Sequence, residues 1–170
     1  VEALGLQAGQ AVLVPTMTFA ATAEVVRYQG AVPILVDCEP DTLLIDLDDA
    51  ARKADAVLRG AFTGGQPLEL AGIIPVHVGG LMTDVGKIRD FANQRQLWVV
   101  EDAAHALPAA VPGDQYPAGW QRCGEGTADV TCFSFYANKT ITTGEGGMAV
   151  TDCAELAERM RQMSLHGLSH

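Results

Sequence analysis

Trp98-Val-Val-Glu-Asp-Ala-Ala-His-Ala106 is a short apolar run that ends in two acidic residues and then in small ones. Such a run is typical of a strand that is covered on both faces of a sheet. Because side chains alternate along a strand, Glu101 and Asp102 should point to opposite sides. One acid can then face a ligand while the other faces the interior. Asp102 has a second interpretation, a cap on a following helical turn, and the motif alone leaves both open.

Similar apolar runs recur along the chain and alternate with helical patterns. The expected strands are 11–15, 32–37, 72–77, 97–101, 130–135 and 147–151, and the expected helices are 19–29, 47–59, 83–95 and 154–165. This alternation predicts an α/β fold with a mostly parallel sheet flanked by helices. Residues 62–70 and 108–128 are rich in turn-forming residues, and we expect both segments to be loops.

Composition narrows the class of protein. The chain has 170 residues with 48% apolar and 19% charged side chains, which suits one globular domain. Its net charge of −10 argues against binding to nucleic acid or to an anionic membrane surface. The four cysteines form no C-x-x-C pair, so we expect no metal site. With neither a long apolar span nor a basic leader at the start, the expected compartment is the cytoplasm.

The stretch Cys132-Phe-Ser-Phe-Tyr-Ala-Asn-Lys-Thr-Ile-Thr-Thr-Gly-Glu-Gly-Gly-Met148 places a lysine directly after an expected strand. The carboxyl ends of parallel strands are where ligands bind in open α/β sheets. A lysine amine that is desolvated at such a place can act as a nucleophile. The simpler interpretation of Lys139 is a surface lysine. The glycine run at 144–147 fits neither a P-loop nor a dinucleotide fingerprint, because its spacing differs and a strand follows it.

A third stretch, Pro15-Thr-Met-Thr-Phe-Ala-Ala-Thr22, runs from a strand end into a helix start. An aromatic ring at this point can lie against a planar ligand. Taken alone, an aromatic residue such as Phe19 is more often simply a core residue.

Together the three stretches resemble the DegT/DnrJ/EryC1/StrS family of sugar aminotransferases, pyridoxal-phosphate (PLP) enzymes of fold type I. The resemblance implies the large, PLP-binding domain of such an enzyme. It implies that Lys139 forms the Schiff base with PLP and that Asp102 pairs with the pyridine nitrogen. It further implies that Ser134 binds the phosphate, that Phe19 stacks on the ring, and that His105 lies near the ring and its phenolic oxygen.

The resemblance also implies that residues 1–170 are a partial domain. The family's upstream phosphate-binding segment and its small C-terminal domain lie outside them, and the chain lacks a starting Met. Leu107-Pro108 and the long segment that follows depart from the family pattern, which expects a small residue and a shorter turn.

The function implied by the resemblance is transfer of an amino group to a nucleotide-linked keto sugar, in polysaccharide or antibiotic-sugar biosynthesis. Glutamate or glutamine is the expected amino donor, and a homodimer is the expected assembly. Two alternatives are a PLP-dependent sugar dehydratase of the same family and a non-catalytic, regulatory relative. Dehydratases of the family commonly carry His where Lys139 stands, and a regulatory domain has no need of a Schiff-base lysine. Both alternatives are therefore disfavoured.

Overall fold

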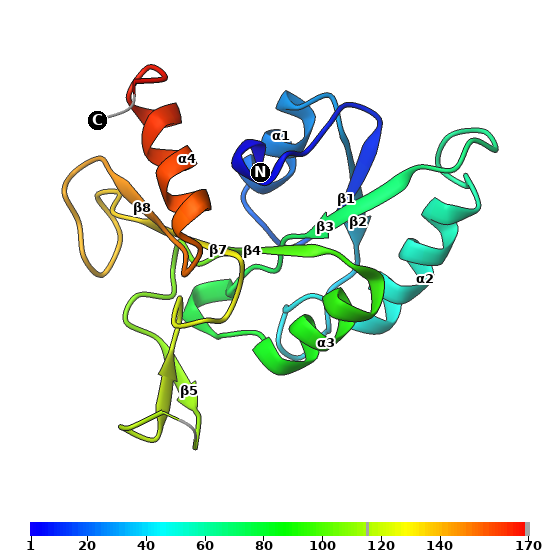
Figure 1. The fold of residues 1–170 in the computed structure, drawn as a ribbon. Coiled ribbons are helices and arrows are strands. Elements are labelled where there is room, and N and C mark those ends of the chain that lie inside the picture. Colours follow the sequence, from blue (N-terminus) through cyan, green and yellow to red (C-terminus); the bar gives the residue numbers. More distant parts are fainter. Residues whose placement is uncertain (115, 169–170) are drawn as a thin grey trace.

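Six strands form one sheet in the computed structural model, which describes residues 1–114 and 116–168 (Figure 1). Across the sheet the order is β2 (Val32–Val36), β1 (Gln10–Pro15), β3 (Glu69–Ile73), β4 (Trp98–Asp102), β7 (Val130–Ser134) and β8 (Gly147–Val150). Neighbouring strands pair in parallel, except that β8 runs antiparallel to β7. The predicted α/β class with a mostly parallel sheet is confirmed.

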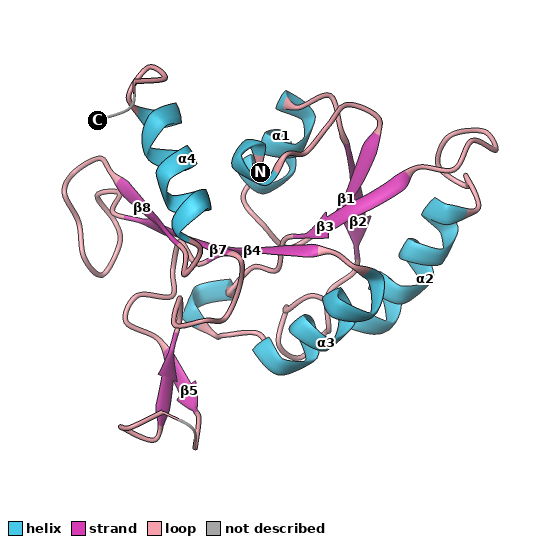
Figure 2. Cartoon of the chain, viewed as in Figure 1, coloured by secondary structure: helices cyan, strands magenta, loops and turns pink. Residues whose placement is uncertain are grey.

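Helices cover both faces of this sheet (Figure 2). One face carries α1 (Ala21–Tyr28) and α4 (Ala154–Ser164), and the other carries α2 (Leu47–Leu58) and α3 (Val85–Arg95). Short 3-10 helices occur at Glu2–Leu4 and Val78–Gly80. Asp84 caps α3, because its carboxylate accepts a hydrogen bond from the Lys87 N–H.

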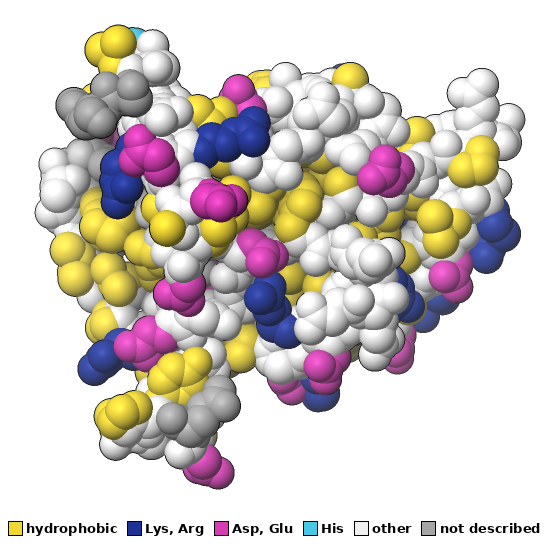
Figure 3. All heavy atoms as spheres, viewed as in Figure 1, with side chains coloured by type: hydrophobic (Ala, Val, Ile, Leu, Met, Phe, Trp, Pro, Cys, Tyr) yellow, Lys and Arg dark blue, Asp and Glu magenta, His cyan; other side chains and the backbone are white. Residues whose placement is uncertain are grey.

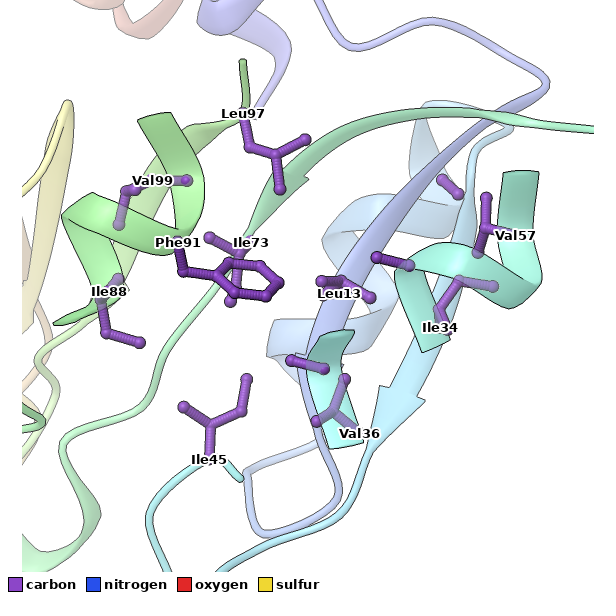
Figure 4. Close-up of a cluster of buried hydrophobic side chains, with 14 residues drawn as sticks. Leu13, Ile34, Val36, Ile45, Val57, Ile73, Ile88, Phe91, Leu97 and Val99 are labelled. Atoms are coloured by element: carbon purple, nitrogen blue, oxygen red, sulfur yellow. The ribbon is translucent and has the colours of Figure 1, made fainter. Parts of the chain in front are cut away.

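Two apolar clusters fill the two sides of the sheet. Figure 4 shows the larger one, in which Leu13 and Ile73 of the strands meet Phe91 of α3. The second cluster packs Val12 and Val100 against α1 and α4. Burial on both faces explains why these strands are continuously apolar rather than alternating.

The segment 108–128, predicted to be a loop, contains a small hairpin instead. Its strands are β5 (Ala110–Pro112) and β6 (Trp120–Arg122), which pair antiparallel. The Tyr116 hydroxyl accepts a hydrogen bond from Gln121 Nε2 at 2.7 Å and donates one to the Glu125 carbonyl oxygen. These local bonds stabilise the hairpin. Burial of Trp120 contributes less, because this residue is 54% exposed. Strands of three residues carry too little periodicity to be recognised in a sequence.

The bounds of β3 also differ from those predicted for this strand. β3 begins at Glu69 and ends at Ile73, rather than covering 72–77. Pro75 has no N–H to donate to a neighbouring strand, which accounts for the early end of the ladder. Val76 nevertheless forms an isolated parallel bridge with Asp102, so this segment still follows β4 to its end.

Acidic and basic side chains are interspersed over the face drawn in Figure 3. In the part of the chain that the structure describes, no helix is long and apolar enough to cross a membrane.

A glycine on β3 makes room for the aromatic residue that starts β4. Gly72 pairs with Trp98, and a Cβ atom at Gly72 would overlap the indole ring. The register of β4, and with it the position of Asp102, therefore depends on the absence of a side chain here.

We predict that Gly72→Ala lowers the free energy of unfolding by about 1–3 kcal/mol, because the added methyl group overpacks a filled site. Gly86→Ala is the matched control. Gly86 lies in α3, where an added Cβ would have only ordinary contact with a carboxylate oxygen of Asp84, at 3.4 Å. There the same substitution should be neutral or stabilise the helix by about 0.5 kcal/mol. Urea unfolding of the two variants measures both effects. Equal stability of the two variants would contradict the packing argument.

Candidate active site

The predicted site residues gather at one edge of the sheet, because the parallel strands end there together. β4 ends in Asp102, β7 ends in Ser134, and the connection from β1 to α1 contains Phe19. A cavity of about 1010 Å³ lies at this edge. Its lining includes all the residues predicted for the site: Phe19, Asp102, His105, Ser134 and Lys139. Residues separated by up to 120 positions in the sequence, from 19 to 139, therefore share one cavity.

Lys139 lies in the loop between β7 and β8, half-buried, and its amine meets a histidine. The distance from Lys139 Nζ to His105 Nε2 is 2.8 Å. The two nitrogens can share a proton, so His105 can accept one from the ammonium group when Lys139 reacts as a neutral amine. The Lys139 N–H bonds the Tyr136 carbonyl oxygen at 3.0 Å, which fixes the backbone below the amine. This geometry differs from the surface lysine of the simpler interpretation.

Ser134 is the last residue of β7. Its Oγ accepts a hydrogen bond from the Tyr136 N–H at 3.3 Å. The hydroxyl hydrogen of Ser134 thus remains available to donate to an anionic oxygen in the cavity.

Asp102 uses both of its carboxylate oxygens. Oδ1 accepts from the Ala104 N–H at 3.2 Å, and Oδ2 accepts from the Thr22 hydroxyl at 2.6 Å. The residues that follow form turns, and no helix of the described chain begins there. Asp102 therefore caps no helix, although its Oδ1 stabilises a turn. The carboxylate lines the cavity.

Phe19 is 80% exposed, which excludes the interpretation as a core residue. The ring stands at the rim of the cavity, where a planar molecule could lie against it.

Glu101 points away from Asp102, as the alternation of the strand predicts. It is 1% exposed, and its Oε2 accepts hydrogen bonds from the hydroxyl groups of Thr127 and Thr131, at 2.6 and 2.7 Å. His77 Nε2 lies 3.4 Å from its Oε1. Burial by itself raises the pKa of Glu101, but the contact with His77 and the two hydroxyl groups outweighs it and lowers the pKa below its ordinary value. The strand thus ends in one structural carboxylate and one that faces the cavity.

His77, Glu101 and Cys123 offer three kinds of metal ligand within 4.8 Å of one another. The hydrogen bonds argue against a metal site. His77 Nδ1 accepts from the Thr83 N–H at 3.1 Å, so the proton of the neutral imidazole is on Nε2 and occupies the lone pair that a metal would need. Burial, with the charge of Glu101 adding to it, raises the pKa of the Cys123 thiol to about 12. We conclude that this cluster stabilises the interior.

Two features of the site were missed by sequence reasoning. The first is Thr22, which ends the quoted stretch 15–22 but gave no sign of contact with Asp102. The second is the segment 75–80, which lies along the end of β4. The Asp102 N–H bonds the Pro75 carbonyl oxygen at 2.9 Å, and the His77 N–H bonds the Asp102 carbonyl oxygen at 3.0 Å.

A glycine completes the contact between these two segments. Gly80 has a φ of +90°, and a Cβ atom there would lie 2.8 Å from the His105 carbonyl oxygen. The pair Gly79-Gly80, separated by one residue from the end of the expected strand 72–77, was the available signal.

Comparison with known proteins is consistent with this geometry. The sequence model that describes the DegT/DnrJ/EryC1/StrS aminotransferase family matches residues 1–170 of this chain. The chain is 39% identical over 168 residues to the spore coat polysaccharide biosynthesis protein SpsC of Bacillus subtilis, covering 99% of this chain and 38% of that protein. It is 37% identical over 166 residues to the GDP-perosamine synthase of Caulobacter vibrioides, covering 98% and 39%.

Solved structures agree. A DegT/DnrJ/EryC1/StrS aminotransferase from Brucella abortus superposes with a TM-score of 0.83 at 33% identity, covering 99% of this chain and 42% of that one. The PLP form of the putative sugar aminotransferase Spr1654 from Streptococcus pneumoniae gives a TM-score of 0.80 at 28% identity, covering 99% and 43%. The chain spans about two fifths of the length of these relatives. Over that span, in sequence and in fold, it belongs to the DegT/DnrJ/EryC1/StrS aminotransferase family, whose cofactor is PLP.

Proposed function

We propose that the full-length protein is a PLP-dependent aminotransferase that transfers an amino group to a nucleotide-linked keto sugar. The observation that carries the proposal is the cavity itself. A lysine amine, a carboxylate, a hydroxyl and an exposed aromatic ring line it together, with His105 Nε2 2.8 Å from the amine. A dehydratase would not need the amine at position 139, and a purely regulatory domain would need none of this set.

The residues present fit PLP group by group. Lys139 supplies an amine for the aldehyde, Asp102 a carboxylate for the ring nitrogen, and Ser134 a hydroxyl for the phosphate. Phe19 is 80% exposed, so it supplies an aromatic face that is largely uncovered. When bound, PLP supplies an electron sink that stabilises negative charge at the substrate carbon.

The protein's own residues would then do the following work. Lys139 would hold the cofactor covalently through Nζ and, as a free amine, would carry the proton to and from the substrate carbon. His105 Nε2 takes up the proton that Nζ must lose before it can react. Asp102 keeps the proton on the ring nitrogen, because a carboxylate beside that nitrogen favours its charged form.

The relatives support a sugar as the substrate. One of them is named for the synthesis of a GDP-linked amino sugar and another for polysaccharide biosynthesis. We extend this class of substrate to the present protein, with an amino acid as donor.

We also propose a homodimer. Apolar side chains such as Trp120, Ile141 and Met148 are half or more exposed, as expected of residues that a second subunit covers. The cytoplasmic compartment stays a prediction.

We predict that the full-length protein, supplied with PLP and glutamate or glutamine, converts at least one member of a panel of nucleotide-linked keto sugars to the amino sugar. Mass spectrometry of the nucleotide sugars measures the product. Lys139→Arg is the matched control, because it keeps the positive charge but cannot bond the aldehyde at ordinary pH. Amino-sugar formation at the wild-type rate by Lys139→Arg would contradict the role of Lys139, and a dehydrated product would favour the dehydratase.

A second prediction concerns Asp102→Asn. At saturating PLP this variant should still bind the cofactor, yet its turnover should fall by about 100-fold or more, since the amide cannot hold a proton on the ring nitrogen by its charge. Glu101→Gln serves as the comparison, because Glu101 lies on the opposite side of β4. It should affect stability more than turnover at a temperature where it is folded. Asp102→Asn turnover close to wild type would reduce the carboxylate to a turn-stabilising role.

A further inference from the structure

The Asp102 carboxylate is held by two hydroxyl groups in series, one from Thr22 in the first turn of α1 and one from Thr18 in the segment before that helix. The Thr22 hydroxyl lies 2.6 Å from Asp102 Oδ2, and the Thr18 hydroxyl lies 2.6 Å from Thr22 Oγ1. Both distances lie within the range of hydrogen bonds between oxygen atoms.

The chain of hydrogen bonds has a single direction. An ionised carboxylate can only accept, so the one hydrogen of the Thr22 hydroxyl must go to Asp102. The oxygen of Thr22 is then free to accept, and it accepts from Thr18. Thr18 thus orients Thr22, and Thr22 orients the carboxylate.

Packing alone does not require a hydroxyl at this position. Thr22 is 5% exposed, and the other buried residue of α1 is Val26, one turn further along. A valine has nearly the shape of threonine and would fill the same space. A buried hydroxyl carries a desolvation cost unless it is hydrogen-bonded, so its presence here points to its partner.

The second carboxylate oxygen is held differently. Oδ1 accepts from the Ala104 N–H, which belongs to the same turn as Asp102. That turn is fixed to the sheet by the bond from the Ala103 N–H to the Cys132 carbonyl oxygen at 2.9 Å. Among the described residues, Thr22 is therefore the one side chain that donates to Asp102, and it sets the rotation of the carboxylate plane.

We propose that Thr22, supported by Thr18, is a positioning residue that fixes the Asp102 carboxylate in the orientation that its partner in the cofactor needs. This inference rests on the proposed function, in which Asp102 pairs with the ring nitrogen. Without the Thr22 hydroxyl, Oδ2 loses its donor and the carboxylate can turn about its last bond. Both the affinity for PLP and the rate of proton transfer then fall.

The test is a double-mutant cycle in the full-length protein. Thr22→Val removes the hydroxyl and keeps the shape, Thr22→Ser restores the hydroxyl, and Thr22→Val is repeated in the Asp102→Asn background. One measurement is the dissociation constant of PLP, from absorbance titration of the cofactor-free protein. The other is the single-turnover rate with the amino donor at saturating PLP, together with the KM for that donor.

We expect Thr22→Val to raise the dissociation constant of PLP and to lower the single-turnover rate by about tenfold each, the size typical of a hydrogen bond to a charged group. The KM for the donor should stay within about twofold, since Thr22 acts on the carboxylate and not on the donor. Thr22→Ser should recover most of both losses. In the Asp102→Asn background, Thr22→Val should have a clearly smaller effect, because the uncharged amide oxygen accepts a weaker hydrogen bond from Thr22 than the carboxylate does. Thr18→Val should give a smaller effect of the same sign, and it serves if Thr22→Val does not fold.

Two results would overturn the inference while leaving the proposed function intact. One is a Thr22→Val variant with wild-type affinity for PLP and wild-type rate. The other is an equal loss with and without the Asp102 carboxylate, which would make Thr22 a packing residue. An Asp102→Asn variant indistinguishable from wild type would instead overturn the role of Asp102, and the positioning role of Thr22 with it.

Discussion

The site depends on a single constraint: the two adjacent carboxylates that end β4 must lie on opposite faces of the sheet. Neighbouring side chains of a strand point to opposite faces, so Glu101 and Asp102 cannot share an environment. Glu101 is buried among threonine hydroxyl groups and His77, which keep its pKa low. Asp102 is thereby directed into the cavity, where Thr22 and a backbone N–H hold its oxygens. The alternation of one strand thus separates a carboxylate that stabilises the interior from one available to a ligand.

The segments around β4 reinforce this arrangement. Gly72 leaves space for Trp98 at the start of the strand, and Gly80 allows the backbone at His105 to approach closely beyond its end. Backbone bonds from Pro75 and His77 lie between these two points. The segment 75–80 therefore supports the backbone from Asp102 to His105. His105 reaches Lys139 from this supported backbone. A site of this kind is preorganised by backbone contacts as well as by its own side chains.

Much of the fold could be predicted from the sequence, because continuous apolar runs and helical patterns of apolar residues are local signals. Those signals place β1, β2, β4, β7 and β8 and the helices to within a few residues. The hairpin at β5 and β6 and the shift of β3 were not predictable in this way, since short strands and ladders interrupted by proline have no clear period. The resemblance of the motifs to a known family predicted five of the residues that line the cavity: Phe19, Asp102, His105, Ser134 and Lys139. Thr22 and His77 depend on contacts between distant segments, which a single sequence does not reveal.

The role of Lys139 can be tested by identifying the lysine that binds the cofactor. The full-length protein, loaded with PLP and reduced with borohydride, would be digested and mapped by mass spectrometry. We expect a phosphopyridoxyl group on Lys139, because its amine is the one lysine nitrogen that lines the cavity among the described residues. Labelling of Lys53, Lys87 or any other lysine in place of Lys139, or no label in a protein that binds PLP, would contradict it.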